Sequence, residues 1–147
     1  MTKRADLIRA AKAYRLKARA HHSEFKVGAA VETAKGKVFG GCNVENATYG
    51  LTVCAERVAL WKALSEGESA FRRIAVVADS KILTPPCGPC RQILWEYCGD
   101  IEVILANLKG DTATYSLSEL FPNPFDNRFL GQKNQRDKKS TAKTPRH

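Results

Sequence analysis

PCGPC at Pro86–Cys90 and CAE at Cys54–Glu56 are two cysteine segments whose first cysteines are 33 positions apart. Each segment opens a predicted helix, over about 54–64 and about 89–98, and a glycine follows soon after each helix, as is typical of a helix end. Between them, IAVVA at 74–78 is a continuous apolar run, which is typical of a buried central strand. The sequence therefore predicts a central strand between two helices that both begin with cysteine.

A further helix is predicted near the N-terminus, over residues 3–20. Leu7, Ala11, Tyr14 and Ala18 recur at intervals of four, three and four, while Lys and Arg occupy the rest of the surface. One apolar stripe on a charged helix indicates an amphipathic helix.

The remaining segments predict strands. VGAAV at 27–31 and the run at 38–41 are joined by a turn signal and predict a hairpin. The small residues of the first run indicate that a helix or a ligand packs close to its backbone. Strands at 101–106 and 112–115 are connected too closely for a crossover helix and are expected to be antiparallel, and one helical turn follows at 116–120. The predicted fold class is α/β, a three-layer α/β/α sandwich with a mixed five-stranded sheet.

The positive charge of the chain is concentrated at its two ends. The 147 residues include 24 Lys and Arg against 15 Asp and Glu, a net charge of +9. Residues 1–20 carry +6 and 133–147 carry +5, whereas 21–132 carry −2. We therefore expect one folded domain over 1–131 and a basic, solvated tail over 132–147, with nucleic acid contacted only through the tail.

The sequence predicts a soluble, cytoplasmic protein without disulfides. No apolar run approaches the ~20 residues that span a bilayer, and the charged N-terminus lacks the apolar region of a signal peptide. The chain has five cysteines, an odd number, which favours thiol or metal chemistry over a disulfide framework.

Three of these cysteines could form a metal site with an open position. Cys54, Cys87 and Cys90 lie at predicted helix starts, where the helix dipole favours the thiolate that binds metal. Three thiolates leave the fourth position of a tetrahedral zinc ion open, as in catalytic sites. A closed structural site would need a fourth ligand. Cys42 is possible on spacing, whereas Cys98 lies about 12 Å from Cys90 along the same helix.

The sequence resembles the small homotetrameric zinc-dependent cytidine deaminases across nearly all of residues 4–125. A three-cysteine site with a non-ligand glutamate and a PCxxC segment is the arrangement of zinc deaminases. The Asn-Val-Glu-Asn-Ala segment narrows the resemblance to enzymes of free nucleosides. The matching segments are FKVGAA at Phe25–Ala30, GCNVENATY at Gly41–Tyr49, CAER at Cys54–Arg57, PCGPCRQ at Pro86–Gln92 and LFPNPF at Leu120–Phe125.

The resemblance implies deamination of cytidine and 2′-deoxycytidine to uridine and 2′-deoxyuridine with release of ammonia, within pyrimidine salvage. It implies one Zn²⁺ per subunit, held by Cys54, Cys87 and Cys90. Glu56 would take a proton from the attacking water, protonate ring N3 and then deliver a proton to the departing amine.

The resemblance also implies the substrate contacts. Asn43 and Glu45 would hydrogen-bond the ribose 3′-hydroxyl, Phe25 would pack on the base, and the Ala55 N–H would meet the ring carbonyl. The resemblance further implies a charge-compensating cation next to the zinc ligands, Arg57, and three residues at or near a pocket completed by neighbouring subunits, Ala47, Tyr49 and Phe125.

Other interpretations stay open at this stage. Asn43 and Asn46 could be turn residues, Glu45 a surface carboxylate and Phe25 a core residue. The family usually has a Pro-Tyr pair where this chain has His21-His22. The alternative functions are a sibling deaminase of blasticidin S, of a free base or of a modified nucleoside, a deaminase that edits RNA or DNA, and a non-catalytic module that binds through its basic ends.

Overall fold

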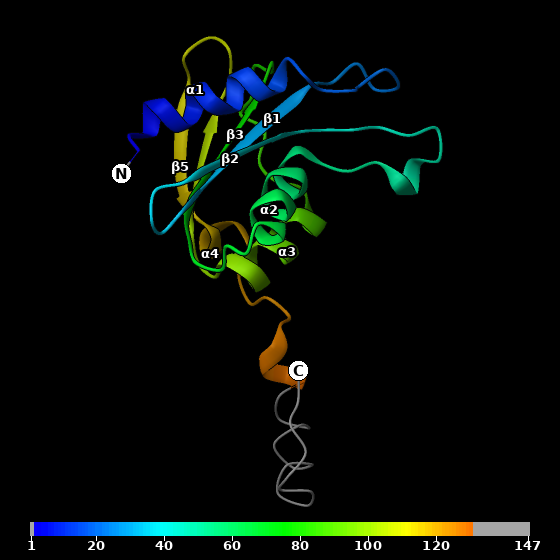
Figure 1. The fold of residues 1–147 in the computed structure, drawn as a ribbon. Helices are drawn as coiled ribbons and strands as arrows, with labels where there is room; N and C mark the ends of the chain where they lie inside the picture. The colour runs from blue at the N-terminus through cyan, green and yellow to red at the C-terminus, as the bar shows by residue number, and fades with distance from the viewer. Residues whose placement is uncertain (1, 131–147) are drawn as a thin grey trace, which may run out of the picture.

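The computed structural model describes residues 2–130, and its elements follow the predicted order (Figure 1). The basic tail predicted over 132–147 lies outside the described residues. The helices are α1 (Arg4–Arg15), α2 (Ala55–Ser65), α3 (Gly88–Cys98) and α4 (Leu117–Leu120), with a 3₁₀ turn at Tyr49–Leu51; the strands are β1 (Val27–Thr33), β2 (Val38–Cys42), β3 (Phe71–Ala78), β4 (Glu102–Ala106) and β5 (Thr112–Ser116).

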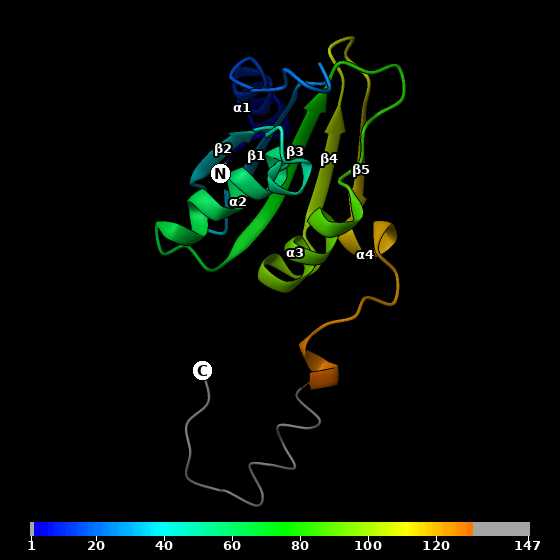
Figure 2. The same cartoon turned by 90° about the vertical axis from the view of Figure 1, so that its right-hand side faces the viewer.

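The predicted mixed five-stranded sheet is confirmed. The strand order is β2-β1-β3-β4-β5. Strands β3 and β4 are parallel, whereas β1 is antiparallel to both of its neighbours and β5 is antiparallel to β4. Figure 2 shows α2 and α3 side by side on one face of the sheet, with α1 across the other. The chain therefore forms the three layers that the sequence predicts.

Alternation along the central strand β3 divides the core between these layers. Ile74 and Val76 join the core cluster that includes residues of α2 and α3. Ala75 and Val77 join a second cluster, which includes Leu7 of α1. Successive side chains of a strand point to opposite faces, so a continuous apolar run is needed where both faces are covered.

Helix α1 is shorter than the predicted helix over 3–20. It ends at Arg15. The backbone N–H groups of Lys17 and Ala18 donate to carbonyls three residues back, which forms a tight last turn. The N–H of Arg19 then donates to the Asn43 carbonyl at 3.0 Å, and the Arg19 carbonyl accepts from the Glu45 N–H at 2.9 Å. Residues beyond the helix therefore hold the segment that follows β2, and Ala18 lies outside the helical stripe.

Glycines bring both helical layers close to the sheet. A Cβ atom at Gly41 would lie 2.4 Å from the Ala59 nitrogen and 2.7 Å from the Ala55 oxygen of α2. A Cβ atom at Gly28 would lie 2.0 Å from the Ala11 oxygen of α1. Each distance is far shorter than a van der Waals contact. Both helices therefore pack directly on the strand backbone at positions where only glycine fits. Of the two expectations for the small residues of β1, a packed helix is therefore the one observed.

Among residues 2–130, no helix is both long enough and apolar enough to cross a bilayer.

The contact at Gly41 gives the first prediction. Gly41→Ala should lower the free energy of unfolding by about 2 kcal/mol or more, because the new methyl group must push α2 away from β2. Urea denaturation followed by circular dichroism measures the change. Gly50→Ala is the matched control, since nothing lies within 4 Å of a Cβ atom there, and its effect should stay within about 0.5 kcal/mol. Equal stability of the two variants would contradict this packing.

Candidate metal centre and substrate pocket

Three cysteine sulfurs meet where α2 and α3 begin. Cys54 is the N-cap of α2, Cys87 is the N-cap of α3, and Cys90 lies in the first turn of α3. Their Sγ atoms all lie within 4.8 Å of one another. The Cys54 and Cys87 sulfurs are 3.7 Å apart, and those of Cys87 and Cys90 are 3.1 Å apart. The two segments that are distant in sequence thus form one cluster.

The donor set of this cluster fits zinc. Soft thiolate sulfurs select zinc over magnesium or calcium. Two sulfurs on a tetrahedral zinc ion, each about 2.3 Å from the metal, would be about 3.8 Å apart, close to the Cys54–Cys87 distance. All five cysteines lie in the described part of the chain, and Cys42 and Cys98 are not in the cluster. A closed four-cysteine site is therefore not formed.

The thiols of the cluster differ in charge. Hydrogen bonding with Cys90, and with Arg57 and Cys87, lowers the pKa of Cys54 to about 5, although burial acts in the other direction. An Arg57 nitrogen lies 3.2 Å from the Cys54 sulfur. The same contact with Cys54, together with burial, raises the pKa of Cys90. These contacts therefore favour the thiolate form of Cys54, which is the form that binds metal.

Glu56 is buried next to this negative charge. It lies in the first turn of α2 and is 5% exposed. Burial raises its pKa to about 7, and the nearby charge of Cys54 acts in the same direction. A carboxyl group with a pKa near 7 can both accept and release a proton at neutral pH. Glu56 is also not a member of the cluster of possible ligands, as an acid–base group requires.

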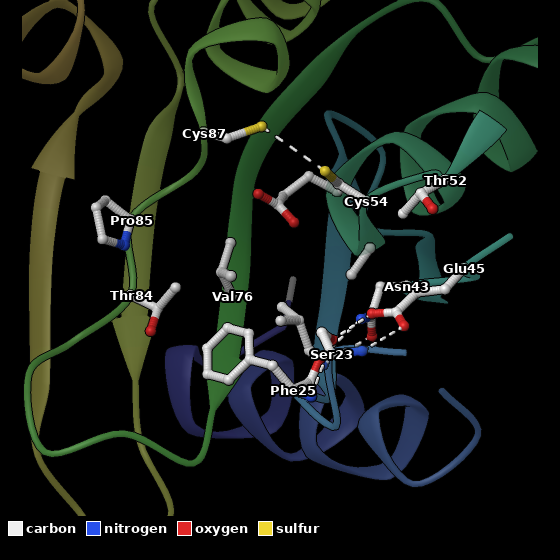
Figure 3. A pocket seen from close by; sticks show the side chains of 13 residues that line it. Ser23, Phe25, Asn43, Glu45, Thr52, Cys54, Val76, Thr84, Pro85 and Cys87 are labelled. Carbon is white, nitrogen blue, oxygen red and sulfur yellow. Dashed lines mark hydrogen bonds between the residues drawn. The ribbon is translucent and has the colours of Figure 1, made fainter. Parts of the chain in front are cut away.

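A cavity of about 230 Å³ opens in front of Glu56 and two of the cysteines (Figure 3). One wall comes from the segment before β1 and the segment after β2, and another from the loop between β3 and α3. The lining residues are Ser23, Phe25, Val27, Asn43, Glu45, Thr52, Cys54, Ala55, Glu56, Val76, Thr84, Pro85 and Cys87.

Asn43 fixes the backbone beside the cavity. Its side chain is nearly buried, and its amide nitrogen donates to the Phe25 carbonyl at 2.8 Å. Its amide oxygen accepts from the Val27 N–H at 2.9 Å. Asn43 thus holds the start of β1 and still lines the cavity, whereas Asn46 is a turn residue whose side chain accepts from the Thr48 N–H at 2.8 Å.

Glu45 accepts three hydrogen bonds from one short loop. The N–H groups of His22 and Ser23 both donate to its Oε1 at 2.9 Å, and the Ser23 hydroxyl donates to Oε2. Hydrogen bonds from Ser23, and one from the backbone of His22, keep the pKa of Glu45 below its usual value. His22 acts here through its backbone, so this contact does not depend on the His22 side chain.

The structure brings four of the predicted substrate residues together and leaves three apart. Phe25, Asn43, Glu45 and Ala55 line the cavity. In the described part of the chain, Ala47, Tyr49 and Phe125 do not line this cavity. Tyr49 lines an adjoining hollow together with Glu45. The side chains of Tyr49 and Phe125 are largely exposed, at 79% and 54%.

Sequence reasoning missed several residues of the cavity wall. Thr52, Val76, Thr84 and Pro85 carry no chemical signal of their own, and Val76 was predicted only as a strand residue. Ser23 was missed because its contact with Glu45 joins positions 22 residues apart. The proximity of Ser23 to the unusual His21-His22 pair was the one available signal.

The fold and the site define the class as an α/β protein with a three-cysteine cluster that fits zinc and a buried carboxyl group beside it. Residues 1–106 match the family model described as the cytidine and deoxycytidylate deaminase zinc-binding region. The chain belongs to this deaminase family, and zinc is its cofactor, one ion per subunit.

Individual relatives agree with this assignment. The chain is 53% identical over 105 residues to a cytidine deaminase of Halalkalibacterium halodurans, covering 71% of this chain and 80% of the relative. It is 43% identical over 125 residues to one from Sporosarcina psychrophila, covering 84% and 92%. A crystal structure of cytidine deaminase from Burkholderia pseudomallei superimposes with a TM-score of 0.82 at 50% identity, covering 84% of this chain and all of that one.

The cysteine cluster gives a prediction about metal content. Cys87→Ser should reduce bound zinc from about one ion per chain to a small fraction, because an alcohol is a far weaker zinc ligand than a thiolate. Zinc in dialysed protein is measured by mass spectrometry of the metal. Cys98→Ser is the control, since Cys98 lies in the same helix outside the cluster. Full zinc in Cys87→Ser, or equal loss in both variants, would argue against the assigned ligand.

Proposed function

We propose that this enzyme hydrolyses cytidine and 2′-deoxycytidine to uridine and 2′-deoxyuridine with release of ammonia. The observation that carries the proposal is one cavity with two chemically different ends. Cys54 and Cys87 of the cluster line the cavity together with Glu56, and Asn43 and Glu45 line it apart from the two cysteines (Figure 3). A base at the first end and a sugar at the second would match a nucleoside, and family membership agrees with that substrate class.

The hydrogen-bonding capacity left on Asn43 and Glu45 suits a sugar hydroxyl. The Asn43 amide nitrogen has two hydrogens and uses one for the Phe25 carbonyl. A carboxylate has about four acceptor sites, and Glu45 uses three, which leaves one on Oε2. One donor and one acceptor remain, and a hydroxyl group needs both. We assign them to the ribose 3′-hydroxyl.

The base is assigned to the space between Phe25 and the metal centre. Phe25 is 40% exposed and lines the cavity, so its ring can pack on a pyrimidine rather than on the core. Ala55 is the first residue of α2, where the backbone N–H has no acceptor inside the helix. That N–H is therefore available to the ring carbonyl.

Glu56 moves the protons of the reaction. Zinc held by Cys54, Cys87 and Cys90 supplies a Lewis acid that makes water a better nucleophile at neutral pH. Glu56 would take one proton from the attacking water and give it to ring N3. It would then take the second proton, from the hydroxyl group added at C4, and give it to the departing amine. A pKa of about 7 suits a group that must act in both directions. Arg57 at 3.2 Å from Cys54 offsets part of the thiolate charge.

The oligomeric state and the cellular location of the enzyme are also proposals. We propose a homotetramer in which neighbouring subunits complete each pocket, with Ala47, Tyr49 and Phe125 near the contacts. The exposure of Tyr49 and Phe125 supports this, because large exposed aromatic groups are characteristic of contact surfaces. A reducing cytoplasm suits five free thiols.

The division of the chain is likewise a proposal. We assign catalysis to residues 1–131 and any contact with nucleic acid to the basic residues 132–147, because the body of the chain carries a slightly negative charge.

A substrate panel tests the function. We expect loss of the ultraviolet chromophore of cytidine and 2′-deoxycytidine on mixing with zinc-loaded protein, and little or no conversion of cytosine, blasticidin S or a single-stranded oligonucleotide, because only the nucleosides match both ends of the cavity. Absence of turnover with both nucleosides would refute the proposal, and faster turnover of another compound would replace it.

The role of Glu56 gives a separate prediction. Glu56→Gln should retain zinc but lower kcat for cytidine by about 10²–10⁴-fold, because an amide cannot carry the proton. Steady-state kinetics and zinc analysis of the same sample measure the two quantities. Glu66→Gln, in the turn after the same helix, should leave both unchanged. Near-normal turnover by Glu56→Gln would remove Glu56 from this role.

A further inference from the structure

One serine connects the two substrate-facing groups at the sugar end of the cavity. The Ser23 hydroxyl donates to Oε2 of Glu45 and accepts from the backbone N–H of Phe25 at 3.0 Å (Figure 3). The Ser23 oxygen is therefore hydrogen-bonded both to Glu45, whose carboxylate is assigned to the ribose, and to Phe25, whose ring is assigned to the base. No other side chain in the described part of the chain is shown in hydrogen bonds to both.

We propose that Ser23 is a positioning residue that makes recognition of the ribose 3′-hydroxyl possible by aiming Glu45. This inference rests on the proposed nucleoside function. The acceptor site left for substrate is on Oε2, the oxygen that Ser23 also occupies. Because the direction of one hydrogen bond to a carboxylate oxygen restricts the other, the Ser23 hydroxyl determines where the remaining acceptor site points.

The loop that carries Ser23 is built to keep this geometry. Glu24, the next residue, has φ +58°, in the left-handed region that costs energy for a residue with a side chain. This turn places the Phe25 N–H over the hydroxyl of Ser23, and Asn43 then holds the Phe25 carbonyl from the other side. The loop therefore presents Ser23 in one arrangement before substrate arrives, which reduces the entropy lost on binding.

The position needs a hydroxyl group and not merely a small residue. Glu45 would keep its two backbone donors at Oε1 if Ser23 were alanine, but Oε2 would lose its only protein partner among those shown. The carboxylate could then rotate or recruit water, since Ser23 is exposed in the single chain. A threonine would retain the hydroxyl.

The test compares substrates with and without the 3′-hydroxyl in the zinc-loaded enzyme. Ser23→Ala should lower kcat/KM for cytidine about tenfold, which is the usual scale for losing one hydrogen bond to a charged group. For 3′-deoxycytidine the loss should be about two- to threefold, because only the support of Phe25 is affected. Ser23→Thr should stay within about threefold of the parent enzyme for cytidine.

Ser118→Ala is the matched control. Its hydroxyl also donates to a carboxylate, Asp100 at 2.8 Å, but away from the cavity, so removing it should change neither substrate. If 3′-deoxycytidine reacts too slowly, inhibition constants of uridine and 3′-deoxyuridine supply the same comparison.

The outcomes separate this inference from the proposed function. Failure of the parent enzyme to convert cytidine would refute the function itself. Normal cytidine turnover by the parent with equal losses for both substrates in Ser23→Ala, or with no loss at all, would overturn only the role of Ser23.

Discussion

The arrangement of the site depends on the meeting of two helix N-termini at one place on the sheet. Each N-terminus carries partial positive charge and unsatisfied N–H groups, so negative charge beside both helix starts is stabilising. Cys54 and Cys87 cap α2 and α3 at that point, and the low pKa of Cys54 supplies the charge. The negative charge that stabilises the two helix starts therefore also favours the binding of a divalent cation at the same place.

The opposite end of the cavity is held mainly by hydrogen bonds between polar side chains and the backbone. Arg19 joins the segment after β2, Asn43 brackets the start of β1, and Glu45 is held by the loop before it. These contacts place rigid polar groups where the edge of the sheet is open. The supports for chemistry and for recognition of substrate are joined by the packing of α2 on β1 and β2. They are also joined by the antiparallel pairing of Val44 with Val53, the residue before Cys54.

Local patterns were sufficient to predict most of the fold and the reactive end of the site. Helix starts, the buried run of β3 and the cysteine spacing depend on near neighbours in sequence, and these predictions agree with the structure. The end of α1 at Arg15 was not predicted, since the apolar spacing continues to Ala18 while the chain turns to pair Arg19 with residues 43–45, which are distant in sequence. The contact of Ser23 with Glu45 was not predicted because it also joins residues distant in sequence. The roles proposed for Tyr49 and Phe125 depend on contacts between subunits.

The pKa of Glu56 connects the metal centre to the acid–base role proposed for this residue. Burial alone favours the protonated acid, and the charge of Cys54 adds to that preference because it repels a second negative charge. Arg57 and a divalent cation at the cluster oppose it. The proton affinity of Glu56 therefore follows the net charge of its neighbours, so three thiolates, one arginine and one cation must be balanced together. A ligand change from sulfur to a neutral group would alter the acid–base residue as well as the metal.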